Sequence, residues 1–231
     1  KKYSDVDSFI DFFILNEITR NVDAYRISTF MHKDINDKLK MGPIWDFNIA
    51  FGNADYCEGG LTNGWAYQFN EACPADGMLV PFWWDRLMQD PYFTNALEER
   101  WTSLRLNELS DINIMGIVDE LVGELEDSDA ITQNFGKWLI LGTYIWPNNF
   151  VGNRHSEEIT YLKEWIEGTN AYQTDAVYQI GAIEAVEYNT SISQLGVYPI
   201  PAKHELNVDL ELGQSEGVTV SIYNLIGELM V

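Results

Sequence analysis

Two aspartates, Asp23 and Asp46, have a spacing at which their carboxylates could do chemistry together. They stand at the two ends of a predicted β-hairpin, with strands over 26–33 and 38–45 and a polar turn at 34–37. Because a hairpin folds the chain back on itself, we expect the two carboxylates to lie near each other. Magnesium is commonly held by one or two carboxylates together with phosphate oxygens. The pair therefore predicts a metal–phosphate site.

The elements around this pair follow an order that protein kinases also use. In kinases an aspartate accepts the proton of the substrate hydroxyl, a short hairpin follows, and the aspartate of Asp-Phe-Gly then holds magnesium. Here Asp46-Phe47-Asn48 stands where Asp-Phe-Gly would be. Asn48 is a candidate metal ligand through its amide oxygen, although a neutral amide binds magnesium more weakly than a carboxylate.

Helices are predicted to support the hairpin on both sides. A helix over 5–20 leads into Asp23, with Ser4 or Asp5 as its cap and phenylalanines at helical spacing. Residues 53–78 are rich in Gly, Asn and Pro and predict a long loop. Further helices are expected at 80–89, 91–106, 111–126, 129–142 and 155–167, and short strands within 195–231, including 206–210 and 218–222.

Several separated motifs within residues 5–167 resemble those of the CotH kinase family, the spore-coat kinases and their secreted bacterial relatives. The motifs are Asn16-Glu17, Asn21-Val22-Asp23-Ala24-Tyr25-Arg26, Gly42-Pro43-Ile44-Trp45-Asp46-Phe47-Asn48, Gly52-Asn53, Pro81-Phe82-Trp83-Trp84-Asp85-Arg86-Leu87, Asp90-Pro91-Tyr92-Phe93 and Arg100-Trp101. The resemblance implies an atypical kinase-like fold that transfers phosphate from Mg-ATP to Ser/Thr hydroxyls of a protein substrate.

The resemblance also implies residue roles. Asp23 would be the catalytic aspartate, and Asp46 with Asn48 would hold the metal. The candidate cofactor-binding residues are Asn21, which lies beside Asp23, and Asn53, which directly follows Gly52 in a loop. We find no Gly-rich phosphate loop and no lysine placed to clamp phosphates. We therefore expect the chain to begin at the C-terminal lobe, with the N-terminal lobe missing from this sequence.

Composition excludes several classes of protein. The net charge is −22, from 14 Lys+Arg against 36 Asp+Glu. This balance disfavours nucleic acid and anionic lipid as partners, because both require basic surfaces. A hydrophobic content of 46% excludes a disordered acidic tail, and no apolar run reaches the roughly 20 residues of a membrane span. The sequence leaves the oligomeric state open.

A change in composition predicts the domain organisation. Every Trp and Phe lies within residues 1–170, whereas the rest of the chain is rich in Val, Ile and turn residues. We expect a kinase C-lobe over 1–170, a linker over 171–193 and a partial β-sandwich over 194–231. The expected fold class is α+β: a mostly helical atypical protein-kinase-like C-lobe with a β-hairpin, plus a small C-terminal β-sandwich piece.

The cysteines and the tail predict an extracellular or cell-surface location. Cys57 and Cys73 are the only cysteines. They could be two free thiols, but we expect a disulfide between them, which would need an oxidising compartment. The tail resembles part of the C-terminal sorting domain of the Bacteroidetes type IX secretion system, which makes that machinery an expected partner. The resembling segments are Gly196-Val197-Tyr198-Pro199-Ile200-Pro201-Ala202, Leu206-Asn207-Val208 and Val220-Ser221-Ile222-Tyr223-Asn224-Leu225-Ile226-Gly227-Glu228.

Two other functions stay open at this point. A secreted surface protein could keep the kinase-like scaffold without catalysis, which the neutral Asn48 and the scarcity of extracellular ATP favour. A glycoside hydrolase also pairs two carboxylates, in a cleft that Trp side chains could line.

Overall fold

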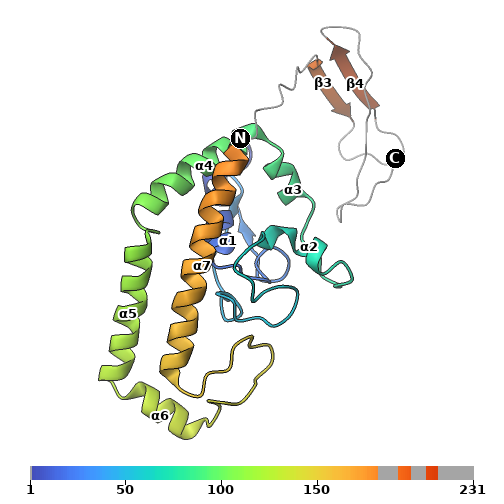
Figure 1. Cartoon of the computed structure of the whole chain (residues 1–231). Helices are drawn as coiled ribbons and strands as arrows, with labels where there is room; N and C mark the ends of the chain where they lie inside the picture. Colours follow the sequence, from blue (N-terminus) through green and yellow to red (C-terminus); the bar gives the residue numbers. More distant parts are fainter. Residues whose placement is uncertain (1, 182–191, 199–206, 213–231) are drawn as a thin grey trace. The chain divides into compact units, whose positions relative to one another are not determined.

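The computed structural model describes residues 2–181, 192–198 and 207–212 and divides the chain into two units, Lys1–Ala182 and Ile183–Val231 (Figure 1). The first unit contains α1 (Val6–Ile18), β1 (Met31–His32), β2 (Lys40–Met41), the 3-10 helix η1 (Ala66–Gln68), α2 (Phe69–Ala72), α3 (Trp83–Met88), α4 (Pro91–Leu106), α5 (Asp111–Asp127), α6 (Ala130–Lys137) and α7 (His155–Gly181). Its mostly helical content with a small antiparallel sheet confirms the predicted α+β class.

Helix α1 lies at the centre of the hydrophobic core. Its N-terminus is capped by Asp5, which accepts the Ser8 backbone N–H, and the Ser8 hydroxyl donates in return to the Asp5 carbonyl at 2.7 Å. Beyond this turn the helix is buried on nearly every side. Phe12 stacks on Trp84 of α3 with 5.8 Å between ring centroids, and Tyr25 meets the same indole edge-on at 4.8 Å. This aromatic packing fixes the end of α1, from which the chain continues to Asp23.

The helix predictions differ most from the structure at the ends of α6 and α7. Helix α6 ends at Lys137, five residues before the predicted end. Helix α7 continues to Gly181, so residues 171–181 of the predicted linker are helical. Gly168 lowers helix propensity, but Trp165 and Ile166 before it are buried, as are Thr169 and Gln173 after it. Packing of this face outweighs the local preference.

The predicted hairpin is present but much shorter than expected. Strands β1 and β2 pair antiparallel through Met31 with Met41 and His32 with Lys40. Residues 26–28 are not strand but part of a turn, because the amides of Ile27 and Ser28 both donate to the Asp23 carbonyl, at 3.0 and 2.9 Å. This turn brings the chain after Asp23 close to the returning segment that carries Asp46.

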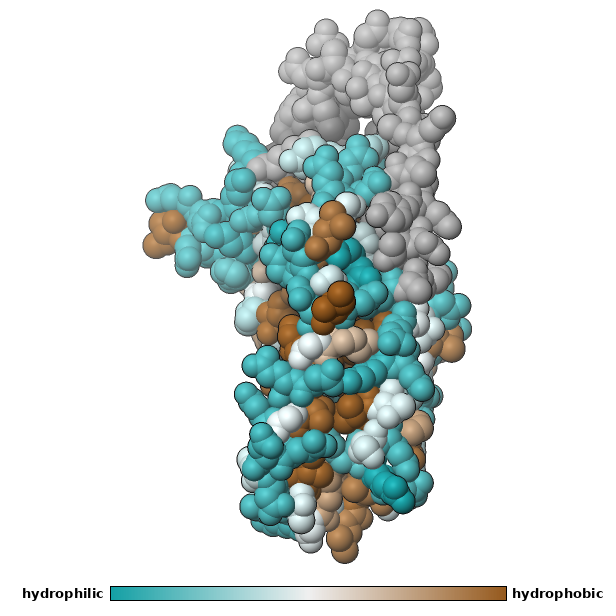
Figure 2. Space-filling model, turned by 60° about the vertical axis from the view of Figure 1, so that its left-hand side comes forward, coloured by the Kyte–Doolittle hydropathy of each residue, from teal (hydrophilic) through white to brown (hydrophobic). Residues whose placement is uncertain are grey.

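Helices α5 and α6 form the least buried part of the first unit. Neither helix has a buried side chain, and apolar residues such as Ile117, Leu121 and Leu125 are exposed on α5. Figure 2, in which this side of the molecule comes forward, shows apolar side chains scattered among hydrophilic ones. No described helix is long and apolar enough to cross a membrane.

The second unit contains the antiparallel strands β3 (Ile192–Tyr198) and β4 (Asn207–Leu212), paired for example through Val197 and Val208. The strand predicted at 206–210 overlaps β4, which ends two residues later. The strand predicted at 218–222 lies outside the described residues.

Candidate functional site

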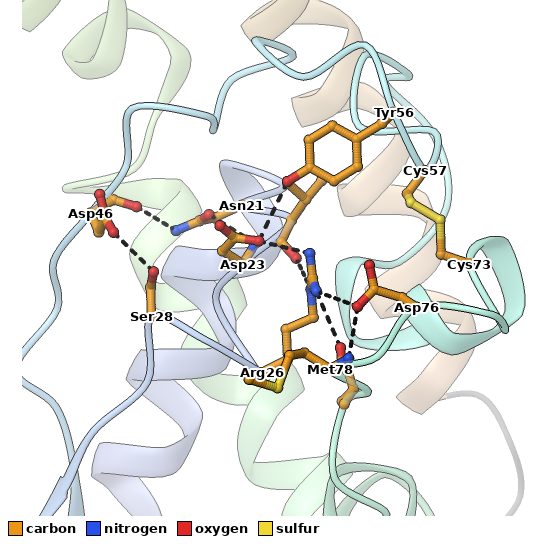
Figure 3. A network of polar contacts seen from close by, with 12 residues as sticks. Asn21, Asp23, Arg26, Ser28, Asp46, Tyr56, Cys57, Cys73, Asp76 and Met78 are labelled. Atoms are coloured by element: carbon orange, nitrogen blue, oxygen red, sulfur yellow. Dashed lines mark hydrogen bonds and ion pairs between the residues drawn. A yellow bond between two sulfur atoms is a disulfide. The ribbon is translucent and has the colours of Figure 1, made fainter. Parts of the chain in front are cut away.

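The side chain of Asn21 joins the segments that carry the two aspartates (Figure 3). Its amide nitrogen donates to the backbone carbonyl of Asp46 at 3.2 Å, and its amide oxygen accepts the backbone N–H of Asp23 at 3.3 Å. Asn21 is only 1% exposed. The buried amide therefore acts as a strut between the two loops, which lie together as the predicted hairpin requires.

Asp46 is exposed and held in an unusual backbone conformation. Its φ is 65°, a left-handed value that costs energy for residues other than glycine but that aspartate tolerates better than most. One carboxylate oxygen, Oδ2, accepts the Ser28 hydroxyl at 3.1 Å. No hydrogen bond from a described residue reaches Oδ1, so this oxygen is open to a ligand.

Asp23 is oriented through one of its two carboxylate oxygens. Oδ1 accepts Arg26 Nη2 at 2.8 Å and the Tyr56 hydroxyl at 3.4 Å. Within the described part of the chain nothing donates to Oδ2. Partial burial raises the pKa of Asp23, with Asp46 and Asp76 adding to the rise, while Arg26 and Tyr56 oppose it. A fixed carboxylate with a raised pKa and one free oxygen is suited to accepting a proton.

Arg26 is the buried centre of this polar network. Its side chain is 3% exposed and pairs with Asp23 at 2.8 Å and with Asp76 at 3.0 Å. The guanidinium lies 3.9 Å from the ring centroid of Phe69 and also donates to the carbonyls of Val22 and Met78. An arginine can hold both carboxylates because its planar fork offers several donors.

The predicted disulfide is present between Cys57 and Cys73, with 5.5 Å between their Cα atoms. Cys57 directly follows Tyr56, and Cys73 precedes Asp76 by three residues. The covalent bond therefore ties together the two loop segments that supply Asp23 and Arg26 with partners, as Figure 3 shows. Arg26, Tyr56 and Asp76 were not among the predicted site residues, although their closeness in sequence to Asp23 and to the cysteines was a usable signal.

The remaining two candidates, Asn48 and Asn53, lie side by side. Asn53 donates from its side-chain amide to the Asn48 carbonyl at 3.0 Å, and Asn48 itself is exposed. Gly52, directly before Asn53, has φ 75°, and a Cβ there would lie 2.3 Å from the Trp165 ring. The loop that follows Asp46 is thus packed closely against α7.

Glu17 has a structural role and makes no described contact with Asp23. Its carboxylate accepts the Tyr25 hydroxyl at 2.8 Å and the backbone amides of Ala66 and Tyr67 at 2.7 and 2.9 Å. Burial raises the pKa of Glu17 to about 7 against the lowering effect of these donors and of Arg20. Glu17 thereby anchors the start of η1 to α1.

These motifs agree with a comparison against protein families. The model described as CotH kinase protein matches residues 1–172. The chain belongs to the CotH kinase family. Searches of the curated proteins and of the solved structures found no match.

Proposed function

We propose that the first unit carries the catalytic half of a CotH-type kinase, which transfers phosphate from Mg-ATP to Ser/Thr hydroxyls of a protein. The observation that carries this proposal is the Asn21 amide, which bonds to the backbone of both Asp23 and Asp46. Family membership supports a kinase-like protein and favours phosphoryl transfer over glycoside hydrolysis.

The residues take distinct parts in this reaction. Asp23 accepts the proton of the substrate hydroxyl at its free oxygen Oδ2, while Arg26 and Tyr56 hold Oδ1 in place. Asp46 offers Oδ1 to the metal while Ser28 fixes Oδ2. Magnesium, when bound, neutralises charge on the phosphates.

The donors at this site fit magnesium held jointly with nucleotide. Among the described residues no group of three or more His, Cys, Asp or Glu side chains could hold a metal alone. Magnesium usually keeps only one or two protein carboxylates when phosphate oxygens are present. Asp46, with the amide of Asn48 beside it, matches that need, and Asn53 supports the Asn48 backbone.

The test is calorimetric titration of Mg-ATP into the full-length protein. Asp46→Ala should abolish binding, whereas Asp34→Ala, an exposed aspartate in the hairpin turn, should leave it unchanged. Asp23→Asn should keep Mg-ATP binding but abolish phosphorylation of a protein substrate. Absence of Mg-ATP binding in the unaltered protein would instead favour a non-catalytic surface protein on the same scaffold.

The proposed setting of this reaction is an oxidising compartment outside the cytoplasm. The disulfide between Cys57 and Cys73 supports it, because such bonds persist mainly in exported proteins. Export through the type IX machinery is proposed from the sequence of the tail. Mass spectrometry of culture supernatant would test it, since the protein should be released from cells and lack a free thiol.

A further inference from the structure

A cavity of about 370 Å³ opens next to the loop that follows Asp46. Its walls come from residues 47–53 and from the end of α6, the segment between α6 and α7 and the first turns of α7. The segment between α6 and α7 is yellow in Figure 1. Apolar side chains dominate these walls, among them Phe47, Phe51, Phe135, Phe150, Ile159 and Leu162. This volume lies at the lower end of the range typical of ligand sites, roughly 300–1,000 Å³.

The polar groups of the cavity define the kind of ligand it would accept. Among the residues that the structure describes, Glu158 is the only charged one in the lining, and its Oε1 already accepts the Gly152 amide at 2.6 Å. The amides of Asn48, Asn53 and Asn148 add donors and acceptors around the apolar walls. With no Lys or Arg in the lining, the cavity is unsuited to phosphate. It suits an apolar group flanked by peptide-like hydrogen-bonding groups.

Both walls of the cavity are connected to the candidate catalytic residues. On one side, Phe47 and Asn48 directly follow Asp46 in the chain. On the other side, the segment before α7 is held by a hydrogen bond of 2.9 Å from the Asp55 amide to the Pro147 carbonyl. Next to it, Trp146 stacks on Tyr56 with 6.0 Å between ring centroids.

Tyr56 completes this connection, because its hydroxyl donates to Asp23. The aromatic stack therefore joins Tyr56, which orients the proposed base, to Trp146, which directly follows the cavity-lining residue Ile145 in the chain. A ligand in the cavity would lie along the same loops that hold both aspartates.

We propose that this cavity receives an apolar side chain, preferably aromatic, of the polypeptide whose hydroxyl is phosphorylated. The inference rests on the proposed kinase function. The apolar walls select the side chain, and the asparagine amides meet the flanking peptide groups.

Direct binding can be measured without nucleotide. The probe is N-acetyl-L-phenylalaninamide, titrated into the full-length protein and followed by NMR at the side-chain amides of Asn48, Asn53 and Asn148. N-acetylglycinamide is the matched control. We expect shifts with the phenylalanine probe alone. Equal shifts with both compounds, or none with either, would overturn the proposal.

Variants that fill the cavity provide a second test of probe binding. Ile159→Trp should weaken probe binding about tenfold or more, because it fills part of the cavity and even one methylene in an apolar pocket is worth roughly 10–200-fold in discrimination. Ile117→Trp, on the exposed face of α5, should have no effect. If Ile159→Trp lowers the melting temperature sharply, Thr143→Trp tests the same cavity from an exposed position in the segment before α7. Unchanged binding in a folded cavity-filling variant contradicts the proposal.

Phosphorylation of a Ser-centred peptide library with Mg-ATP links the cavity to the reaction. Products should be enriched in Phe, Tyr, Trp or Leu at one position near the serine, and Ile159→Trp should remove that enrichment. A flat profile from an active kinase overturns the cavity proposal alone. Probe binding without any Mg-ATP binding overturns the kinase proposal instead, so the two failures are distinguishable.

Discussion

Removal of the disulfide between Cys57 and Cys73 should measurably destabilise the first unit. The bond closes a loop with a sequence separation of 16. In the chain-entropy model a loop of this length is worth about 3 kcal/mol, because the cross-link restricts the unfolded chain. Each kcal/mol corresponds to roughly 2–4 °C of melting temperature for a domain of this size, so a fall of about 6–12 °C is expected.

The assay is thermal unfolding followed by circular dichroism, with and without dithiothreitol. The unaltered protein should melt about 6–12 °C lower when reduced. The Cys57→Ser/Cys73→Ser variant should melt near the reduced value and should not respond to dithiothreitol, which makes it the control for other effects of the reductant. A melting temperature that is the same in oxidised and reduced protein would refute the reasoning.

The same perturbation should separate catalysis from nucleotide binding. The disulfide ties Tyr56 and Asp76 to the network around Asp23 and Arg26, but no described contact links it to Asp46. Reduction at a temperature where the protein stays folded should therefore slow phosphoryl transfer several-fold while leaving the Kd for Mg-ATP unchanged. Parallel loss of both would contradict this division of roles.

Two further predictions concern buried charges. Arg26→Met should lower the free energy of unfolding by about 3 kcal/mol, because it leaves Asp23 and Asp76 without their shared cation. Urea unfolding measures this change, with Arg26→Lys as the charge-conserving control. A change below about 1 kcal/mol would contradict the prediction. Glu17 has a pKa raised from 4.5 to about 7, so the stability it contributes is fully present below pH 4.5 and is lost as the pH rises through 7. The unaltered protein should lose up to about 3 kcal/mol more than Glu17→Gln between pH 5 and 8, and parallel pH profiles would count against a raised pKa.

Local signals were sufficient to predict most helices and to predict that the segments carrying Asp23 and Asp46 lie together. Asp5 caps α1 as predicted, and Asp90 caps α4 directly before the predicted start of that helix, because a capping side chain acts on amides two or three residues away. The hairpin was predicted correctly in position but not in length. The turn after Asp23 uses backbone hydrogen bonds that carry no strong residue signature.

The sequence by itself determined the family, the order of helix, aspartate, hairpin and second aspartate, and the cysteine pair. Each of these depends on residue types and on spacing along the chain. Only the tertiary structure decided that Arg26 is shared between Asp23 and Asp76 and that Asn21 is a strut. It also decided that the segment before α7 forms a cavity beside the loop after Asp46. Burial and contacts between segments far apart in sequence create these features, so no local pattern could specify them.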